Sequence, residues 1–345
     1  MPRKIVFALI LALVLTGCGG KSRMVLYTWS DMFPREILNS FEKDTGYKIR
    51  YVTFDTNETM IAKLDAAKGG RYDLVIADDY MVENVVNNGL AQRIDRSLLS
   101  NYANINTIYQ GQFYDPADEY TIPYGAGVQT IVFDPEKVEI PINGYFELWH
   151  PSLKQEVGII DNFRVINGMA LKVMRQSYNT NDLDAIQAAG QFLISLAPNI
   201  RLIRDDKLED ELVSGEIAVA VMYTSQVTMA KMEKPGLEVV FPREGIGFGI
   251  MPAFIPVNAP NPAAAHAFLD YILDAERGAA CFMELGYYST FLASDPYIED
   301  EYREFLTLPE DFRDFVTMEM IRNVSEEAEA MHSRVWTEFK SAAGR

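Results

Sequence analysis

Aromatic, hydroxyl and acidic side chains follow directly after two apolar, strand-like segments of the chain. The first segment ends in Trp29, Ser30 and Asp31, and the second ends in Asp78, Asp79 and Tyr80. Because open α/β sheets bind their ligands beyond the carboxyl ends of their strands, we expect both groups to lie at one such edge. These residue types can hold a small molecule, and neither group contains a nucleophile beside a base.

The rest of the sequence offers no catalytic constellation. The three histidines, His150, His266 and His332, lie in separate segments without the spacing of metal ligands. No Walker or G-x-S-x-G motif occurs, and the acidic pairs 205–206 and 326–327 are typical of solvated helix faces. We therefore predict a protein that is no enzyme and that has no metal and no cofactor.

The first 17 residues have the pattern of a signal peptide. Arg3 and Lys4 precede the apolar run 5–15, which is shorter than the roughly 20 residues that a membrane-spanning helix needs. The motif Leu-Thr-Gly-Cys ending at Cys18 resembles the bacterial lipobox, and this predicts a lipid on the Cys18 sulfur. An ordinary signal peptide with an incidental cysteine is the alternative. Residues 18–23 would then form a flexible tether.

The composition is that of an acidic, exported protein. The 345 residues carry a formal net charge of −18, and their mean hydropathy is −0.05. Such a charge repels nucleic acid and anionic lipid and would attract cations, although acidity can also serve solubility alone. Besides Cys18 the chain has only Cys281, which lies in an apolar helical pattern and is predicted to be a small buried hydrophobe.

The pattern of elements predicts two α/β units. Residues 24–95 alternate strand and helix, with 89–95 as a connecting strand, which indicates a doubly wound parallel sheet. Residues 120–132 read as two β segments broken by small residues and proline, typical of a crossing between domains. A second α/β unit follows, and the carboxyl-terminal part is predicted to be helical, including 309–323. The chain passes from the first unit to the second and returns, and this order implies a cleft between two sheets.

Several short motifs resemble bacterial spermidine/putrescine-binding proteins, the extracytoplasmic receptors of polyamine ABC importers. They include Trp29-Ser30-Asp31, the segments 41–46, 57–64 and 72–80, Ile122-Pro123-Tyr124, Leu148-Trp149 and Leu285-Gly286-Tyr287, in family order along the mature chain. The resemblance implies a periplasmic-binding-protein-like α/β fold, with two lobes joined by a hinge and a ligand cleft between them. It divides the chain into lobe 1, residues 24–127 and 250–300, and lobe 2, residues 128–249 and 301–345.

The resemblance also implies a ligand site in which aromatic rings stack on a polyamine and carboxylates pair with its ammonium groups. The positions it implies are Trp29, Ser30, Asp31, Asp78, Asp79, Tyr80, Tyr124, Asn162, Tyr223, Phe248, Met251, Tyr287 and Arg322. This chain departs from the family where Asn162 and Val165 replace carboxylates, where Gly249 and Met251 replace a tryptophan and an aspartate, and where Arg322 replaces a glutamine.

Most of these positions also have a structural interpretation. Trp29 could belong to the core, Asp78 and Asp79 could cap the following helix, and Tyr124 and Phe248 could pack in the hinge. Tyr223 fits either role equally well. Arg164 is predicted to be a structural ion-pair partner rather than a ligand contact.

These observations lead to one functional prediction with two alternatives. We expect a monomeric, lipid-anchored receptor in the periplasm or at the cell surface that binds a small amine, such as putrescine or spermidine, and passes it to an ABC permease. The lost carboxylates leave room for a receptor of a zwitterion or another organic amine. A surface lipoprotein that binds a protein partner is the third possibility.

Overall fold

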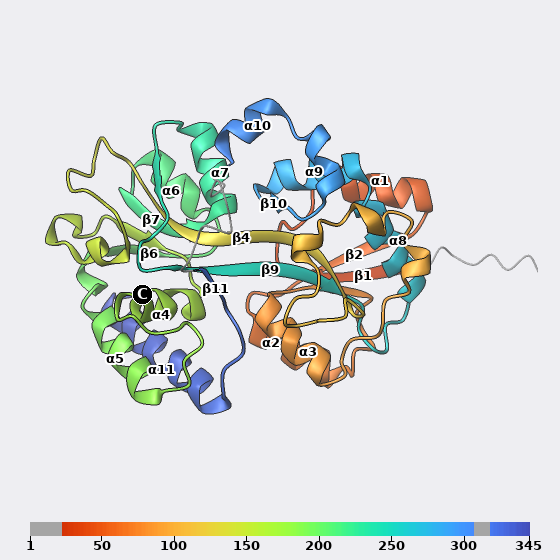
Figure 1. Ribbon diagram of the computed structural model, residues 1–345, viewed down its shortest axis with the longest axis horizontal. Helices are drawn as coiled ribbons and strands as arrows, with labels where there is room; N and C mark the ends of the chain where they lie inside the picture. The colour runs from red at the N-terminus through yellow and green to blue at the C-terminus, as the bar shows by residue number, and fades with distance from the viewer. Residues whose placement is uncertain (1–22, 307–317) are drawn as a thin grey trace, which may run out of the picture.

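The computed structural model describes residues 23–306 and 318–345 (Figure 1). The predicted signal peptide, Cys18 and the tether up to residue 22 lie outside the described residues. Within the described ranges, no helix has both the length and the apolar character needed to cross a membrane.

One half of the molecule, here called lobe 1, is built on three parallel strands with helices between them. The strands are β1 (Arg23–Thr28), β2 (Lys48–Thr53) and β3 (Leu74–Ile76), and the helices are α1 (Arg35–Thr45), α2 (Asn57–Ala66) and α3 (Asp79–Asn87). Gly46 ends α1 in the left-handed conformation (φ 73°), which glycine adopts without steric cost. This is the predicted alternation, except that residues 89–95 form no strand and contribute only an isolated bridge from Ala91 to Pro256.

Two long strands, β4 (Thr121–Phe133) and β9 (Ile246–Phe254), run across the middle of the molecule (Figure 1). They place all the strands in one sheet with the central order β2-β1-β3-β9-β4-β7-β5-β6. The prediction of two separate β segments in 120–132 is wrong, because β4 is continuous and absorbs Pro123 through a register shift before Gly125. The pairing of β4 with β9 ends at Val128, and its pairing with β7 begins at Gln129.

The other half, here called lobe 2, repeats the α/β plan. Its strands are β5 (Val157–Ile159), β6 (Ile200–Ile203), β7 (Val219–Tyr223) and β8 (Glu238–Val240), and its helices are α4 (Phe163–Val173), α5 (Leu183–Ile194), α6 (Leu208–Ser214), α7 (Thr224–Glu233) and α11 (Glu326–Ala342). Strands β5, β6 and β7 are parallel, so their carboxyl ends share one edge. Helix α11 packs on α5 and α4 (Figure 1).

The remaining elements complete both lobes. They are α8 (Pro262–Ile272), α9 (Ala275–Leu285), β10 (Tyr288–Ser289), α10 (Asp300–Phe305), β11 (Met318–Met320), and the 3-10 helices Arg96–Leu98, Tyr102–Asn104, Thr107–Tyr109, Tyr145–Trp149, Pro151–Leu153, Ala197–Asn199 and Leu292–Tyr297. The predicted helix 309–323 is wrong at 318–320, which is a strand paired with β9. Residues 309–317 of that prediction lie outside the described residues.

Aromatic side chains fill the core of lobe 1 beneath α1, α8 and α9. Phe41 and Phe268 are fully buried, with ring centroids 5.0 Å apart. Burial of such a ring contributes about 1.5–3 kcal/mol to stability, so these helices are held firmly on the sheet. Cys281 is fully buried in the same cluster, which confirms its prediction as a small core residue.

Candidate functional site

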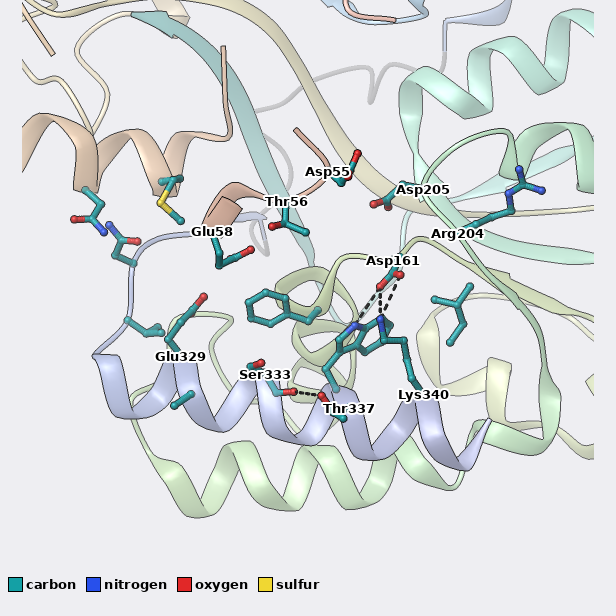
Figure 2. Close-up of a pocket in the computed structure, with 18 of the residues that line it drawn as sticks. Asp55, Thr56, Glu58, Asp161, Arg204, Asp205, Glu329, Ser333, Thr337 and Lys340 are labelled. Carbon is teal, nitrogen blue, oxygen red and sulfur yellow. Dashed lines mark hydrogen bonds and ion pairs between the residues drawn. The ribbon is translucent and has the colours of Figure 1, made fainter. Parts of the chain in front are cut away.

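A cavity of about 1090 Å³ lies between the two lobes (Figure 2). Its walls come from the amino-terminal end of α2 and from α3 on one side, and from α11 and the ends of β5 and β6 on the other. Seven carboxylates line it, those of Asp55, Glu58, Asp161, Asp205, Asp206, Glu326 and Glu329. Among the described residues, only two cationic side chains line it, those of Arg204 and Lys340. We call this space the outer cavity.

Three of these acids follow directly after strands. Asp55 lies two residues beyond β2, Asp161 two residues beyond β5 and Asp205 two residues beyond β6. The strands deliver them to the sheet edges that face each other across the cavity, which is where α/β folds bind ligands. The same rule that selected Trp29 and Asp78 could have selected these residues. Instead, the sequence interpretation of 205–206 as a solvated helix face missed their position in the cavity wall.

Both cations of the outer cavity are already paired with acids. Lys340 Nζ lies 3.2 Å from Asp161 Oδ1, and the Trp336 indole N–H donates to the same oxygen at 3.2 Å. Figure 2 shows Asp161 and Lys340 facing each other on the lobe 2 wall. Arg204 pairs with Glu211 at 2.8 Å. The remaining carboxylates therefore dominate the electrostatic field, and the cavity attracts cations.

Beside the outer cavity, Asp78 occupies a fixed, half-buried position in lobe 1. The Asn57 side-chain amide donates to Asp78 Oδ2 at 2.8 Å and to the Tyr80 hydroxyl oxygen at 2.9 Å. Burial raises the pKa of Asp78 to about 6, the hydrogen bond from Asn57 opposes this rise, and the charge of Glu58 adds to it. Asp78 is the N-cap residue of α3 but makes no side-chain capping bond, so its carboxylate remains available.

Tyrosines from both lobes lie close enough to Asp78 for its charge to act on them. Tyr223 ends β7, and its hydroxyl oxygen accepts a hydrogen bond from Asn162 at 3.0 Å. Burial raises the pKa of Tyr223 and that of Tyr287, and in both cases the nearby charge of Asp78 raises it further. We call Asp78, Tyr80, Asn162, Tyr223 and Tyr287 the inner group.

Asp205 connects the inner group with the outer cavity. The pKa of Asp205 is raised to about 6, first by burial within the cleft walls and then by the charges of Asp161 and Asp78. The side chain keeps exposed surface, so the walls around it restrict its solvation without covering it. Asp78 and Asp205 come from opposite lobes, and a cation bound between them would lower the raised pKa of both carboxylates.

Asp79 differs from its neighbour Asp78, although the sequence offered the same two roles for both. The Asp79 carboxylate is buried, where it accepts the backbone N–H of Ile250 at 3.0 Å and that of Tyr80 at 2.8 Å. It therefore attaches the start of α3 to the crossing strand β9. Its function in this structure is to position Tyr80 rather than to face the cleft.

Three of the other predicted residues follow β1, and the rest lie on β9 or, like Tyr287 of the inner group, pack against β4. Trp29 is half-buried with its ring 4.4 Å from that of Phe54, while Ser30 and Asp31 are exposed, Asp31 in a left-handed turn (φ 54°). Met251 and Tyr287 both pack over Gly125, and Phe248 lies half-buried on β9.

Two predicted residues do not join these groups. Tyr124 is fully buried in the lobe 1 core and donates its hydroxyl hydrogen to the Met32 carbonyl at 2.7 Å, as packing demands. Arg322 points to Glu83, 3.1 Å away. Arg164 is buried and pairs with Glu329 at 3.1 Å, which confirms its prediction as a structural ion-pair partner.

None of the thirteen predicted ligand residues is among those that line the outer cavity. Several lie one position away from a lining residue, as Tyr80 lies beside Met81 and Asn162 lies between Asp161 and Phe163. The described residues contain no group of three or more histidine, cysteine or acidic side chains placed to hold a metal ion. The arrangement is suited to holding an organic cation.

Comparison with known proteins gives a consistent result. The family model of bacterial extracellular solute-binding proteins matches residues 36–304. The spermidine/putrescine-binding periplasmic protein of Salmonella typhimurium is 30% identical over 343 residues, which cover 98% of this chain and 97% of the relative. The protein of the same name from Escherichia coli is 30% identical over 305 residues, 88% of each chain.

A solved structure from Listeria monocytogenes, described as a spermidine/putrescine ABC transporter, superposes with a TM-score of 0.86. It is 25% identical and covers 92% of this chain and 98% of its own. This likeness confirms the predicted two-lobed, periplasmic-binding-protein-like fold. The chain therefore belongs to the bacterial extracellular solute-binding proteins of ABC transporters, among the relatives of the spermidine/putrescine-binding proteins, and it binds a solute rather than acting as an enzyme.

Proposed function

We propose that the solute is a small organic cation, a polyamine such as putrescine or spermidine or a related amine, bound in the cleft between the lobes. The observation that carries this proposal is the charge of the cleft. Seven carboxylates line the outer cavity, both of its cations are paired, and Asp78 lies beside it among tyrosines. Ammonium groups pair with carboxylates, and the aliphatic chain with its cations stacks on aromatic rings.

A zwitterionic ligand is less well supported. Its carboxylate would need a free cation, and the two arginines that could serve are engaged elsewhere: Arg164 with Glu329, and Arg322 with Glu83. A receptor of an amino-acid-like zwitterion and a lipoprotein that binds a protein partner remain the alternative outcomes of the test below.

The hinge proposal rests on β4 and β9. We place the lobe boundaries at residues 24–127 with 250–300 and at 128–249 with 301–345. The change of partners along β4, from β9 up to Val128 to β7 from Gln129, supports a boundary at this point. Rotation of the lobes about these crossing strands would open the cleft to solvent and close it on the ligand.

We further propose that Cys18 carries a lipid anchor, that the protein works as a monomer outside the cytoplasm, and that it delivers its ligand to an ABC permease. The lipobox-like motif ending at Cys18 supports the anchor. Mass spectrometry of the purified protein would detect the diacylglycerol on Cys18, and Cys18→Ala should release the protein from the membrane fraction.

Thermal unfolding in the presence of candidate ligands tests the solute. We expect putrescine or spermidine to raise the midpoint, because a ligand that binds only the folded state stabilises it by mass action, by about 2.7 kcal/mol at 100 times Kd. Stabilisation by zwitterions alone would favour the first alternative. If no small molecule shifts the midpoint, the protein-partner alternative gains support.

A further inference from the structure

The segment that connects β11 with α11 lies along the boundary between the lobes (Figure 1). Its backbone is fixed to lobe 2 at Arg322, where the N–H donates to Asn179 Oδ1 at 2.7 Å and the carbonyl accepts from the Arg164 guanidinium at 3.0 Å. The same stretch is secured at Glu319, which pairs with Lys172 at 2.5 Å. The backbone of Arg322 therefore moves with lobe 2.

The side chain of Arg322 crosses to lobe 1. Its guanidinium lies 3.1 Å from Glu83 Oε1 on α3 and 4.7 Å from the ring centroid of Phe113. The backbone N–H of Asn323 also points to Glu83, with 3.4 Å between nitrogen and Oε2. The Glu83 side chain is only 16% exposed, and it receives both the Arg322 guanidinium and the Asn323 N–H from lobe 2. The three residues Arg322, Glu83 and Phe113 form what we call the clasp.

The clasp is linked to the inner group through a single buried residue. Arg164 donates to the Arg322 carbonyl, pairs with Glu329 and lies 5.6 Å from the ring centroid of Tyr80. Tyr80 belongs to lobe 1 and Arg164 to lobe 2, so this contact, like the clasp, joins the two lobes. The Arg164 side chain therefore contacts both the inner group, through Tyr80, and the backbone of the clasp residue Arg322.

From these contacts we infer that Arg322 and Glu83 are positioning residues that hold the lobes together from outside the ligand site and so set the affinity for the cation. This inference rests on the proposed function for its ligand, but the contacts between the lobes that it describes can be tested without that ligand. When only the closed arrangement binds well, the apparent Kd equals the intrinsic Kd divided by the closed fraction. Removal of the clasp lowers that fraction and weakens binding.

The variant Arg322→Ala separates this account from simple electrostatics. Arg322 is a cation beside an acidic cleft, so its removal should tighten binding of an amine if only charge mattered. The clasp predicts the opposite, a rise in Kd for putrescine of about threefold to tenfold, the range expected for a partly exposed ion pair with a cation–π contact. Isothermal titration calorimetry measures the change.

The chain offers a matched control within lobe 1. Arg93 pairs with Glu119 at 2.5 Å and lies 5.7 Å from the Tyr120 ring centroid, so it is also an Arg–Glu pair beside an aromatic ring, but it does not cross between the lobes. Arg93→Ala should leave the Kd for putrescine unchanged. The double exchange Glu83→Arg with Arg322→Glu keeps the net charge and should restore part of the lost affinity.

A distance measurement without ligand tests the clasp by itself. Nitroxide labels at Lys63→Cys on α2 and Glu338→Cys on α11 report the gap between the lobes, with Cys18→Ser in every variant and Cys281 buried. We expect Arg322→Ala to shift the ligand-free distribution toward longer distances, and Arg93→Ala to leave it unchanged. Unchanged distances in Arg322→Ala, or unchanged or tighter putrescine binding, would overturn the inference. Failure of putrescine to bind any variant would count against the proposed function, while the ligand-free distances would still decide for or against the clasp.

Discussion

The inner group and the outer cavity are neighbours, yet they handle charge in different ways. The inner group has one carboxylate, Asp78, fixed by Asn57 and close to tyrosines from both lobes. The outer cavity has seven carboxylates, and several of them remain in contact with water, such as Asp206 with 75% of its side chain exposed. The inner group is half-buried and held by hydrogen bonds, whereas the outer cavity is more exposed to water and strongly charged.

This difference indicates that the two regions have different roles in binding, one in affinity and the other in the rate of encounter. An ion pair gains most where its partners are fixed and desolvated, whereas exposed charges are screened and act mainly on the rate of encounter. We therefore expect Asp78 and its tyrosines to determine affinity, and the outer carboxylates to draw cations toward the cleft.

The largest expected effect is that of Asp78→Asn. A hydrogen bond to a charged group contributes about 1.5–3 kcal/mol, so the Kd for putrescine should rise by roughly one to two orders of magnitude. Asp206→Asn is the matched control, because Asp206 is exposed and already 3.4 Å from Arg204. Calorimetry should find only a small change in Kd for Asp206→Asn. Equal changes for the two substitutions would contradict the assignment of affinity to the inner group.

The pH dependence of binding should follow from the same carboxylate. The pKa values of Asp78 and Asp205 are each raised to about 6 in the free protein, and an amine binds their ionised forms. Affinity should therefore be constant at higher pH and fall below pH 6, by about tenfold per pH unit for each carboxylate that must lose its proton. Titrations from pH 5 to 8 would show this, and Asp78→Asn should flatten the curve. Affinity that rises as the pH falls would contradict the assignment.

The tyrosines should contribute less than the carboxylate. Tyr223→Ala removes a ring that can contact the cation, and such contacts contribute about 0.5–2 kcal/mol, which corresponds to a loss of about twofold to thirtyfold in affinity. Tyr223→Phe keeps the ring and loses only the hydrogen bond from Asn162, so it should bind nearly as well as the wild type. If both variants bind equally poorly, the hydroxyl group and not the ring face carries the interaction.

The smallest effect should come from the outer cavity. The combined substitution Asp55→Asn and Glu58→Gln removes two exposed charges from the lobe 1 wall. We expect the association rate constant to fall about twofold to fivefold at low salt, with little change in dissociation. Stopped-flow measurements at increasing salt should bring the variant and the wild type together. A slower rate that salt does not alter would point to a structural defect.

Part of this cleft could be predicted from the sequence, because the carboxyl ends of parallel strands follow a simple rule. Asp78 follows the apolar strand β3 and Tyr223 ends the apolar strand β7, so the rule selects both residues, and the structure places both in the inner group beside the outer cavity. Asp55 and Asp205 obey the same rule but come after strands with polar residues, so their pattern is a weaker signal. Asp161 follows β5, a buried strand without polar side chains, and the same rule applied there would have selected it. The two-lobed fold followed from the same alternation of strands and helices.

Other features depend on contacts between distant segments. The sequence pattern does not distinguish Asp78 from Asp79, and the contact with the distant Ile250 N–H is what attaches Asp79 to β9. Trp336 and Glu329 reach the cavity because α11 packs across α4 and α5, which periodicity alone does not reveal. Arg322 was expected at the ligand, and its capture by Glu83 depends on a partner 239 positions away.

A crystal structure of the protein grown with putrescine tests the central claim most directly. The account predicts that the diamine lies between the lobes, with one ammonium nitrogen within hydrogen-bond distance of the Asp78 carboxylate and its chain against Tyr80 or Tyr223. A diamine bound outside the cleft, or a cleft in which Asp78 contacts no ammonium group, would contradict it.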